Sequence, residues 1–127
     1  MTDSKILIDS SAWLAHFGDT DNGQIEAIVK SQITIYTSVI TLFEIKRKLL
    51  KEKVTKESLI ESLNNIIERS IIVDIDNAIC LLAAEHAVAH NLAAVDALIY
   101  ATTKLNSCTL VTFDNNFRNL ENVKVLK

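Results

Sequence analysis

An apolar run ends at an aspartate and a helical pattern follows in the segment Ile6-Leu7-Ile8-Asp9-Ser10-Ser11-Ala12-Trp13-Leu14. Residues 5–8 are short and apolar, as in a buried strand, and residues 10–17 carry apolar side chains at helical spacing. A buried strand that leads directly into a helix is the repeating unit of α/β proteins. The segment therefore predicts such a unit, with Asp9 at the carboxyl end of its strand.

The same alternation continues to the end of the chain. Further strands are expected at residues 33–36, 71–73, 109–112 and 123–126, and further helices at residues 22–31, 38–53, 55–69, 76–90, 94–105 and 114–120. This order predicts an α/β fold in which helices cover both faces of a mostly parallel sheet. Sites in such sheets lie at the carboxyl ends of strands, near the point where the strand order reverses.

The composition is that of one globular domain without linkers. The chain has 127 residues, 49% of them hydrophobic, with two Gly and no Pro, so we expect a single domain over residues 1–127. Its apolar runs are too short to cross a bilayer and no signal-peptide pattern is visible, so we expect a cytoplasmic protein. Cys80 and Cys108 have apolar neighbours and no zinc-site spacing, which indicates reduced core thiols.

The net charge of −3 argues against sequence-blind adhesion to nucleic acid, which depends on Lys and Arg. Four carboxylates at a metal site would account for more than this whole negative charge. A mildly acidic enzyme can therefore still act on a phosphodiester, provided that its cations face the substrate.

Four acidic residues, Asp9, Glu44, Asp96 and Asp114, border apolar segments, although Asp74 and Asp76 also flank an isoleucine. Asp9 and Asp114 follow predicted strands, so they fall on one rim of the sheet, but either could simply cap the helix after it.

Asp96 interrupts an apolar stretch, where an unpaired buried carboxylate is costly, although it too could cap a helix. Glu44 lies within the longest apolar-faced helix, where Arg47 and Lys48 at i+3 and i+4 offer salt bridges instead.

If the fold brought these four carboxylates together, their repulsion would favour a bound cation between them. Two carboxylates ~5 Å apart repel by about 3 kcal/mol at an effective dielectric of about 20. Ligands that are all oxygen favour hard ions such as Mg²⁺ or Mn²⁺ and leave room for water and a substrate phosphate. The pattern therefore indicates a metal site if the fold brings the four carboxylates together.

Four segments resemble the PIN-domain family, and within it the small VapC-type toxin nucleases, in family order over nearly the whole chain. They are the opening segment quoted above, Thr37-Ser38-Val39-Ile40-Thr41-Leu42-Phe43-Glu44-Ile45, Val95-Asp96-Ala97-Leu98-Ile99-Tyr100-Ala101-Thr102 and Leu110-Val111-Thr112-Phe113-Asp114-Asn115-Asn116-Phe117. The resemblance implies a three-layer α/β/α sandwich with strand order 3-2-1-4-5 and metal-dependent cleavage of RNA. It also implies a cognate antitoxin that covers the acidic pocket, and a homodimer.

Carried over by position, the resemblance makes the four carboxylates the ligands of one or two Mg²⁺ or Mn²⁺ ions, with Asp9 and Asp96 as leading direct ligands. Ser10 and Thr112 match hydroxyl positions near the metals. Many relatives have a further acid where this chain has the neutral Asn116. This departure implies that one ion binds firmly while another arrives with substrate.

Basic residues near these acids are candidates for contacts with RNA. Lys46, Arg47 and Lys48 lie on the predicted helix that carries Glu44, and Arg118 follows Asp114 by four residues. A solvated helix face is the alternative for the three on the helix.

The spacing of the aromatic and histidine side chains indicates packing roles rather than catalytic ones. Trp13 and Phe17 at i and i+4 favour core or dimer packing over base stacking. His86 and His90 have the spacing of a zinc pair but no evident third ligand, so we interpret them as surface histidines.

Other enzyme classes fit less well. A haloacid-dehalogenase-type phosphatase needs a second Asp two residues after the first, where this chain has Ser11. A response-regulator receiver needs an acidic pair at the first strand, although Lys124 matches its lysine near the last strand. No nucleotide-binding glycine loop is present. The alternative left open is a catalytically weak or inactive PIN-fold module that binds RNA or a protein.

Overall fold

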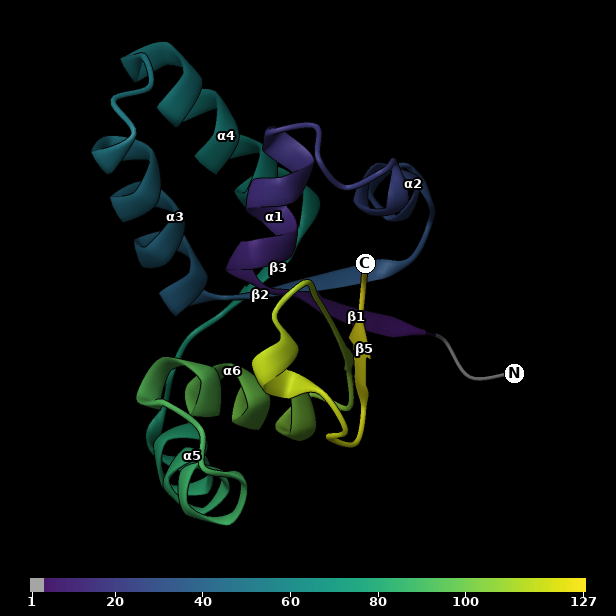
Figure 1. The fold of residues 1–127 in the computed structure, drawn as a ribbon, viewed down its shortest axis with the longest axis vertical. Coiled ribbons are helices and arrows are strands. Elements are labelled where there is room, and N and C mark those ends of the chain that lie inside the picture. Colours follow the sequence, from purple (N-terminus) through teal and green to yellow (C-terminus); the bar gives the residue numbers. More distant parts are fainter. Residues whose placement is uncertain (1–3) are drawn as a thin grey trace.

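A computed structural model describes residues 4–127, and a five-stranded sheet crosses its centre (Figure 1). Its strands are β1 (Lys5–Ile8), β2 (Thr34–Ser38), β3 (Ile71–Val73), β4 (Thr109–Thr112) and β5 (Val123–Val125). They lie in the order β3-β2-β1-β4-β5, and each described pairing is parallel. The order expected from the resemblance is confirmed. It reverses between β1 and β4, so a crevice opens at the carboxyl ends of these two strands.

Helices cover both faces of the sheet, which makes three layers. One face carries α1 (Ser10–Phe17), α2 (Gln24–Lys30), α3 (Val39–Lys51) and α4 (Lys56–Arg69), and the other carries α6 (Ala94–Leu105) with α5 (Asn77–His90) outside it (Figure 1). The short 3-10 helix η1 (Asn115–Phe117) joins β4 to β5 on the α6 side. The predicted α/β/α sandwich is confirmed.

The central strands are apolar on both faces because both faces are covered. Successive side chains of a strand point to opposite sides, so Ile8 and Val111 belong to the core under α1 to α4. Leu7 and Leu110 belong to the core under α6. The register confirms this, since Leu7 is opposite Leu110 and Ile8 is opposite Val111.

Trp13 anchors α1 in the core, as the i, i+4 spacing with Phe17 predicted. Its side chain is 1% exposed, and its Nε1 donates to Thr37 Oγ1 at 3.2 Å. The Thr37 hydroxyl lies 2.8 Å from the Ser70 hydroxyl, which donates to Ile66 O at 2.7 Å. The buried polar atoms in this series of hydrogen bonds, from Trp13 to Ile66, therefore all have partners, as a low-dielectric core favours.

Helix α2 starts at Gln24, two residues later than the sequence predicted. The carboxylate of Asp21, 2% exposed, accepts hydrogen bonds from the backbone N–H groups of Gly23, Ile25 and Glu26. Gly23 has φ +74, a conformation that glycine adopts without strain. Burial opposes ionisation of Asp21, but these hydrogen bonds and nearby His16 leave its pKa lowered. Asp21 is thus a buried anionic cap that delays the start of the helix.

The other end of α2 is held by Arg69, the last residue of α4. Its guanidinium donates to four backbone carbonyls, those of Ile28, Val29, Ser31 and Ile33, at 2.7–3.4 Å. The final turn of a helix exposes unpaired carbonyls with partial negative charge, which a guanidinium can satisfy. Arg69 therefore ties α4 to the end of α2 and to the loop before β2.

The packing of helix α5 contradicts one prediction about the cysteines. Cys108 is buried, as expected, and burial raises the pKa of its thiol to about 11. Cys80 is exposed, so its interpretation as a core thiol was wrong. The reason is that α5 is apolar around its whole circumference but packs on α6 with one side only, which leaves Leu81 and Val88 largely exposed.

No single helix within residues 4–127 is both long and apolar enough to cross a membrane. Only the pair α5 and α6, bent by 115° at their junction, satisfies that criterion jointly, on length and composition alone.

Candidate active site at the carboxyl ends of the strands

Asp9 lies at the carboxyl end of β1 and is 5% exposed. Its Oδ1 accepts from the backbone N–H of Ala12 at 3.1 Å and from the Ser11 hydroxyl at 2.8 Å, and its Oδ2 accepts from the Thr112 hydroxyl. Asp9 thus caps α1, as the alternative interpretation of the sequence expected. It also reaches across to β4, which an ordinary cap does not do.

Ser11, which the sequence interpretation did not single out for the site, holds β1 and β4 together beside Asp9. Its hydroxyl lies 3.2 Å from the Thr112 hydroxyl and accepts from the backbone N–H of Phe113 at 3.0 Å. The available signal was a hydroxyl residue two positions after an aspartate at a helix start. Of the two hydroxyl residues that the resemblance singled out, Thr112 donates to Asp9 and Ser10 lies beside Glu44.

Asp114 follows β4 by two residues and caps η1, since its Oδ1 accepts from the backbone N–H of Asn116 at 2.9 Å. Its own backbone N–H donates to the Thr112 hydroxyl at 2.9 Å. Asp9 and Asp114 are therefore fixed to the same threonine, on the two sides of the crevice where the strand order reverses. Asn116 is exposed beside Asp96.

Glu44 and Asp96 reach the crevice from helices. Helix α3 follows β2 and α6 leads into β4, so both helices begin at the carboxyl edge of the sheet. Asp96 lies in the first turn of α6, whose N-cap residue Ala93 makes no side-chain cap, so Asp96 is not the cap that the sequence left open. A carboxylate there also meets the positive end of the helix dipole.

The four carboxylates act on one another in a closed ring. Burial raises the pKa of Asp9, Glu44 and Asp96, and neighbouring charges raise each further. Asp114 acts on Asp9 and on Asp96, while Asp9 and Asp96 both act on Glu44. Each member of the ring therefore has two others as electrostatic neighbours, although they come from four separate segments. We call these four residues the acidic ring.

Hydroxyl and amide groups partly offset this repulsion. Hydrogen bonds from Thr112, Ser11 and the backbone of Ala12 lower the pKa of Asp9 but do not cancel the effect of burial. Ser10 and Arg47 act in the same sense on Glu44, and Asn116 does so on Asp96. The unrelieved repulsion is what a bound cation would remove.

The donor set fits a hard divalent cation, because every ligand atom the ring offers is a carboxylate oxygen. Among the described residues, no three His, Cys, Asp or Glu side chains stand close enough to enclose an ion by themselves. A site that supplies one or two carboxylates and leaves the remaining positions to water and phosphate is usual for Mg²⁺. The acidic ring therefore fits a partly hydrated ion rather than a closed protein cage.

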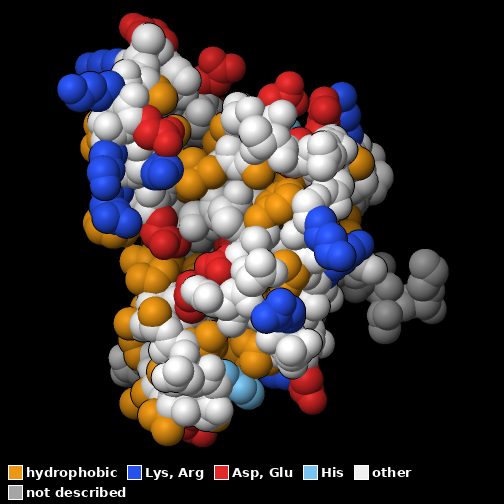
Figure 2. All heavy atoms as spheres, in the orientation of Figure 1, with side chains coloured by type: hydrophobic (Ala, Val, Ile, Leu, Met, Phe, Trp, Pro, Cys, Tyr) orange, Lys and Arg blue, Asp and Glu red, His pale blue; other side chains and the backbone are white. Residues whose placement is uncertain are grey.

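Basic and acidic side chains lie near each other on the face that Figure 2 shows. Acidic atoms appear near the centre, between the α3 half of the molecule and the α6 half, and Lys and Arg atoms line the edge over α3. Lys46, Arg47 and Arg118 are exposed, and Arg47 lies near enough to Glu44 to act on its charge. Lys48 is exposed too, but it pairs with Glu52 at 3.5 Å.

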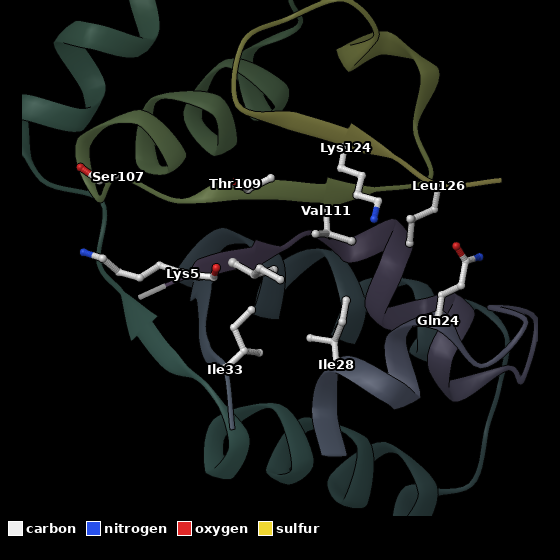
Figure 3. A pocket seen from close by; sticks show the side chains of 11 residues that line it. Lys5, Gln24, Ile28, Ile33, Ser107, Thr109, Val111, Lys124 and Leu126 are labelled. Carbon is white, nitrogen blue, oxygen red and sulfur yellow. The ribbon is translucent and has the colours of Figure 1, made fainter. Parts of the chain in front are cut away.

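A groove of about 820 Å³ lies away from the acidic ring, on the face of β1, β4 and β5 beside α2 (Figure 3). Helix α2 forms one wall of the groove through Gln24 and Ile28, whereas η1 packs on the opposite face of the sheet. Its floor is apolar, from Ile6, Val111 and Leu126, and Lys124 of the edge strand points into it. An inward lysine on an edge strand guards against unwanted strand pairing. Within residues 4–127, the lining of the groove includes no acidic residue that could offer a carboxylate to a metal.

The sequence of this chain matches the PIN domain over residues 6–123, which run from within β1 to the first residue of β5 and include all four members of the acidic ring. The chain belongs to the PIN-domain family. No curated protein matches it. Three similar solved structures cover almost the whole chain and share its fold.

The first is a toxin-antitoxin complex from Klebsiella pneumoniae, with 19% identity, a TM-score of 0.78, and 94% of this chain and 96% of that one covered. The second is VapBC2 from Rickettsia felis bound to a promoter DNA fragment, with 20% identity, a TM-score of 0.78, and 97% and 99% covered. The third is VapC20 from Mycobacterium tuberculosis, a toxin that cleaves the sarcin-ricin loop, with 18% identity, a TM-score of 0.76, and 96% and 99% covered.

Proposed function

We propose that this PIN-domain protein is a divalent-metal-dependent endoribonuclease, with the acidic ring of Asp9, Glu44, Asp96 and Asp114 as its active site. The observation that carries the proposal is the ring itself. Four carboxylates from separate segments repel one another at the crevice where the strand order reverses, which is where α/β folds place their sites. A fold has no structural reason to keep such repulsion, and a cation would relieve it.

Asp9 and Asp96 would hold the metal directly, Asp114 directly or through water, and Glu44 would ligate or orient the attacking water. A bound Mg²⁺ or Mn²⁺ would supply charge that stabilises the phosphoryl transition state and eases ionisation of water. One ion would bind firmly, and another would come with substrate, because Asn116 is neutral.

The residues of the chain supply positioning and proton transfer. In hydrolysis of a phosphodiester, a water oxygen bonds to phosphorus and the bond to the leaving ribose oxygen breaks. The attacking water loses a proton, and the leaving oxygen gains one from solvent. Glu44, partly buried beside Asp9 and Asp96, is the carboxylate that we assign to accept the proton of the attacking water. Ser11 and Thr112 hold Asp9 in one orientation, which keeps the ring assembled before substrate arrives.

Exposed basic side chains would guide the RNA backbone. Arg47 lies on α3 near Glu44, Lys46 is its neighbour, and Arg118 lies beyond Asp114 on the other side of the crevice. Lys48 contributes less, because its ammonium pairs with Glu52. Phosphate contacts of this kind set the register of a nucleic acid without reading its sequence.

The partners proposed are RNA, an antitoxin protein and a second copy of the chain. Proteins of the PIN family are nucleases, and the similar structures include toxin-antitoxin complexes and a toxin that cleaves a ribosomal RNA loop. The protein would thus be the toxin of a toxin-antitoxin pair, with an antitoxin that covers the acidic ring. The exposed Leu81 and Val88 on α5 support self-association into a homodimer.

The direct test is an RNA digest with Mg²⁺, with Mn²⁺ and with EDTA, beside an Asp96→Asn variant purified in the same way. We expect cleavage with either metal, none in EDTA, and a loss on the order of a hundredfold or more in the variant. Asp19→Asn, an exposed loop residue with a backbone that Asn tolerates, is the matched control and should cleave normally. If wild type and Asp96→Asn cleave equally, the protein is a binding module of the PIN fold.

Metal should stabilise the protein more at neutral pH than in acid. The raised pKa values of Asp9, Glu44 and Asp96 mean that the metal-free folded state binds protons more tightly than the unfolded chain. The stability that these three carboxyl groups contribute is complete below their ordinary pKa values, 3.8 for Asp and 4.5 for Glu. It is lost as pH rises through their raised pKa values in the folded state. Mg²⁺ at a hundred times its Kd would restore about 2.7 kcal/mol.

Thermal unfolding with and without Mg²⁺, at about pH 5 and about pH 7.5, measures this linkage. We expect a larger Mg²⁺-induced rise in Tm at the higher pH, and a smaller rise in Asp96→Asn. Equal rises at both pH values would show that the ring is not the metal site.

A further inference from the structure

A second cavity, of about 410 Å³, lies on the same side of α6 as the acidic ring. Asp96, Tyr100 and Lys104 are spaced at i, i+4 and i+8 on α6, so they share one face of the helix. At a rise of 1.5 Å per residue, Lys104 lies about 12 Å along the helix from Asp96. Tyr100 and Lys104 line the cavity, and Asp96 lies one helical turn before Tyr100. Its lining includes His86, His90, Tyr100, Lys104, Asn119 and Glu121.

The segment after η1 forms a fixed outer wall for this cavity. The Tyr100 hydroxyl donates to the backbone carbonyl of Glu121 at 2.9 Å, and Lys104 Nζ donates to Asn122 Oδ1 at 2.9 Å and to Glu121 Oε2 at 3.3 Å. These two hydrogen bonds tie the ammonium of Lys104 to the segment. Arg118 lies in the same segment, between Asp114 and Asn119, and is exposed.

Ring side chains form the inner wall. The rings of His86 and His90 lie nearly parallel, with centroids 5.6 Å apart, and both stand edge-on to Tyr100, at 4.7 and 5.8 Å. Tyr100 is buried at the floor, whereas His90 is exposed. Figure 2 shows histidine atoms over the α5–α6 pair, on the face that also carries the central acidic atoms.

One polar atom of this wall lacks a partner. His86 Nε2 is buried and makes no hydrogen bond to any described residue. Burial, helped by the charges of His90 and Lys104, lowers the pKa of His86, so its ring is neutral near pH 7. A buried nitrogen without a partner is unfavourable, and a ligand with a polar edge would satisfy it.

We propose that this cavity binds an unpaired nucleobase of the RNA strand that is cut at the acidic ring, an inference that rests on the proposed function. A base has apolar faces and a polar edge, and the cavity offers the exposed ring of His90 for stacking. His86 Nε2 and the Asn119 amide offer hydrogen bonds to the edge, and Arg118 offers a contact to the phosphate on the way to the ring. The base must leave its stack to enter, so the enzyme selects single strands and loops over duplex RNA.

A scan with abasic nucleotides tests this site. A labelled RNA that the wild-type protein cleaves is prepared with one base removed at each position in turn, and its binding is measured by anisotropy with the Asp96→Asn protein, which leaves the strand intact. We expect about tenfold weaker binding at one position near the cleaved bond, because loss of one stacked base has an effect of this size.

Three further substitutions, each combined with Asp96→Asn, locate that base. His90→Ala removes the exposed ring, and His86→Phe keeps the packing against Tyr100 but removes Nε2. Asn119→Gly removes the amide at a residue with φ 71, a conformation that glycine accepts. Each variant should bind the intact RNA more weakly, and removal of the base at that one position should no longer weaken its binding. Asn22→Gly, with φ 54 in the loop before α2, is the matched control and should behave as the parent protein.

The outcomes separate this inference from the function on which it rests. One outcome is that RNA is cleaved with metal but removal of no single base weakens binding. Another is that removal of one base still weakens binding in all three variants. In either case the cavity is not the base site, and only the inference fails. If the wild-type protein neither binds nor cleaves RNA, both fail.

Discussion

Replacing Asp9 by Asn is expected to reduce the rate of RNA cleavage by on the order of a thousandfold while the chain stays folded. Asp9 is the most buried member of the acidic ring and faces the charges of Glu44 and Asp114. The substitution removes the negative charge that would bind the cation and places an amide NH₂ among groups that now donate to a carboxylate.

The effect on stability should be small, which makes this variant informative. Loss of a buried charge relieves repulsion within the ring, whereas the Thr112 hydroxyl loses the acceptor to which it donates. The fluorescence of Trp13, which is buried four residues from Asp9, reports whether the helix keeps its packing. Initial rates on one RNA with saturating Mg²⁺, beside Asp19→Asn, measure the loss. A variant that keeps more than about a tenth of the activity would remove Asp9 from the metal site.

The first strand and helix follow from local sequence alone. The predicted ranges 5–8 and 10–17 agree with β1 and α1, because an apolar run ends at a residue that caps the next helix. Local pattern also placed Asp9 and Asp114 on one rim, since both follow strands of a parallel sheet. The mutual repulsion of Glu44 and Asp96 with these two could not be derived from spacing, because it depends on how helices distant in the sequence pack.

Other contacts left no local signal. The shortened start of α2 depends on a left-handed backbone at Gly23 combined with a buried carboxylate at Asp21. The exposure of Cys80 depends on which side of an apolar helix meets its neighbour. The role of Ser11 depends on the position of β4, which begins about a hundred residues later and is joined through Thr112. Each is set by tertiary packing, which overrides the local pattern.

Replacing Arg69 by Ala should destabilise the protein by about 2–4 kcal/mol without changing the chemistry at the acidic ring. The guanidinium donates to four carbonyls that lie 36 to 41 residues away in the sequence, at the end of α2 and in the loop before β2. Hydrogen bonds from a charged donor are worth more than neutral ones, but water can replace part of them at this half-buried position. The geometry needs a planar fork, so Arg69→Lys should recover only part of the loss.

Denaturant unfolding measures the difference, with Arg118→Ala as the matched control. Arg118 is exposed and makes no side-chain hydrogen bond or ion pair within the described part of the chain, so its removal should change stability by less than about 0.5 kcal/mol. Hydrogen exchange at the amides around the end of α2 should also rise in Arg69→Ala, because that segment loses its anchor before the sheet does. If both variants unfold at the same midpoint, water satisfies the four carbonyls as well as the guanidinium does, and the packing of Ile25, Ile28 and Val29 holds α2 to the core.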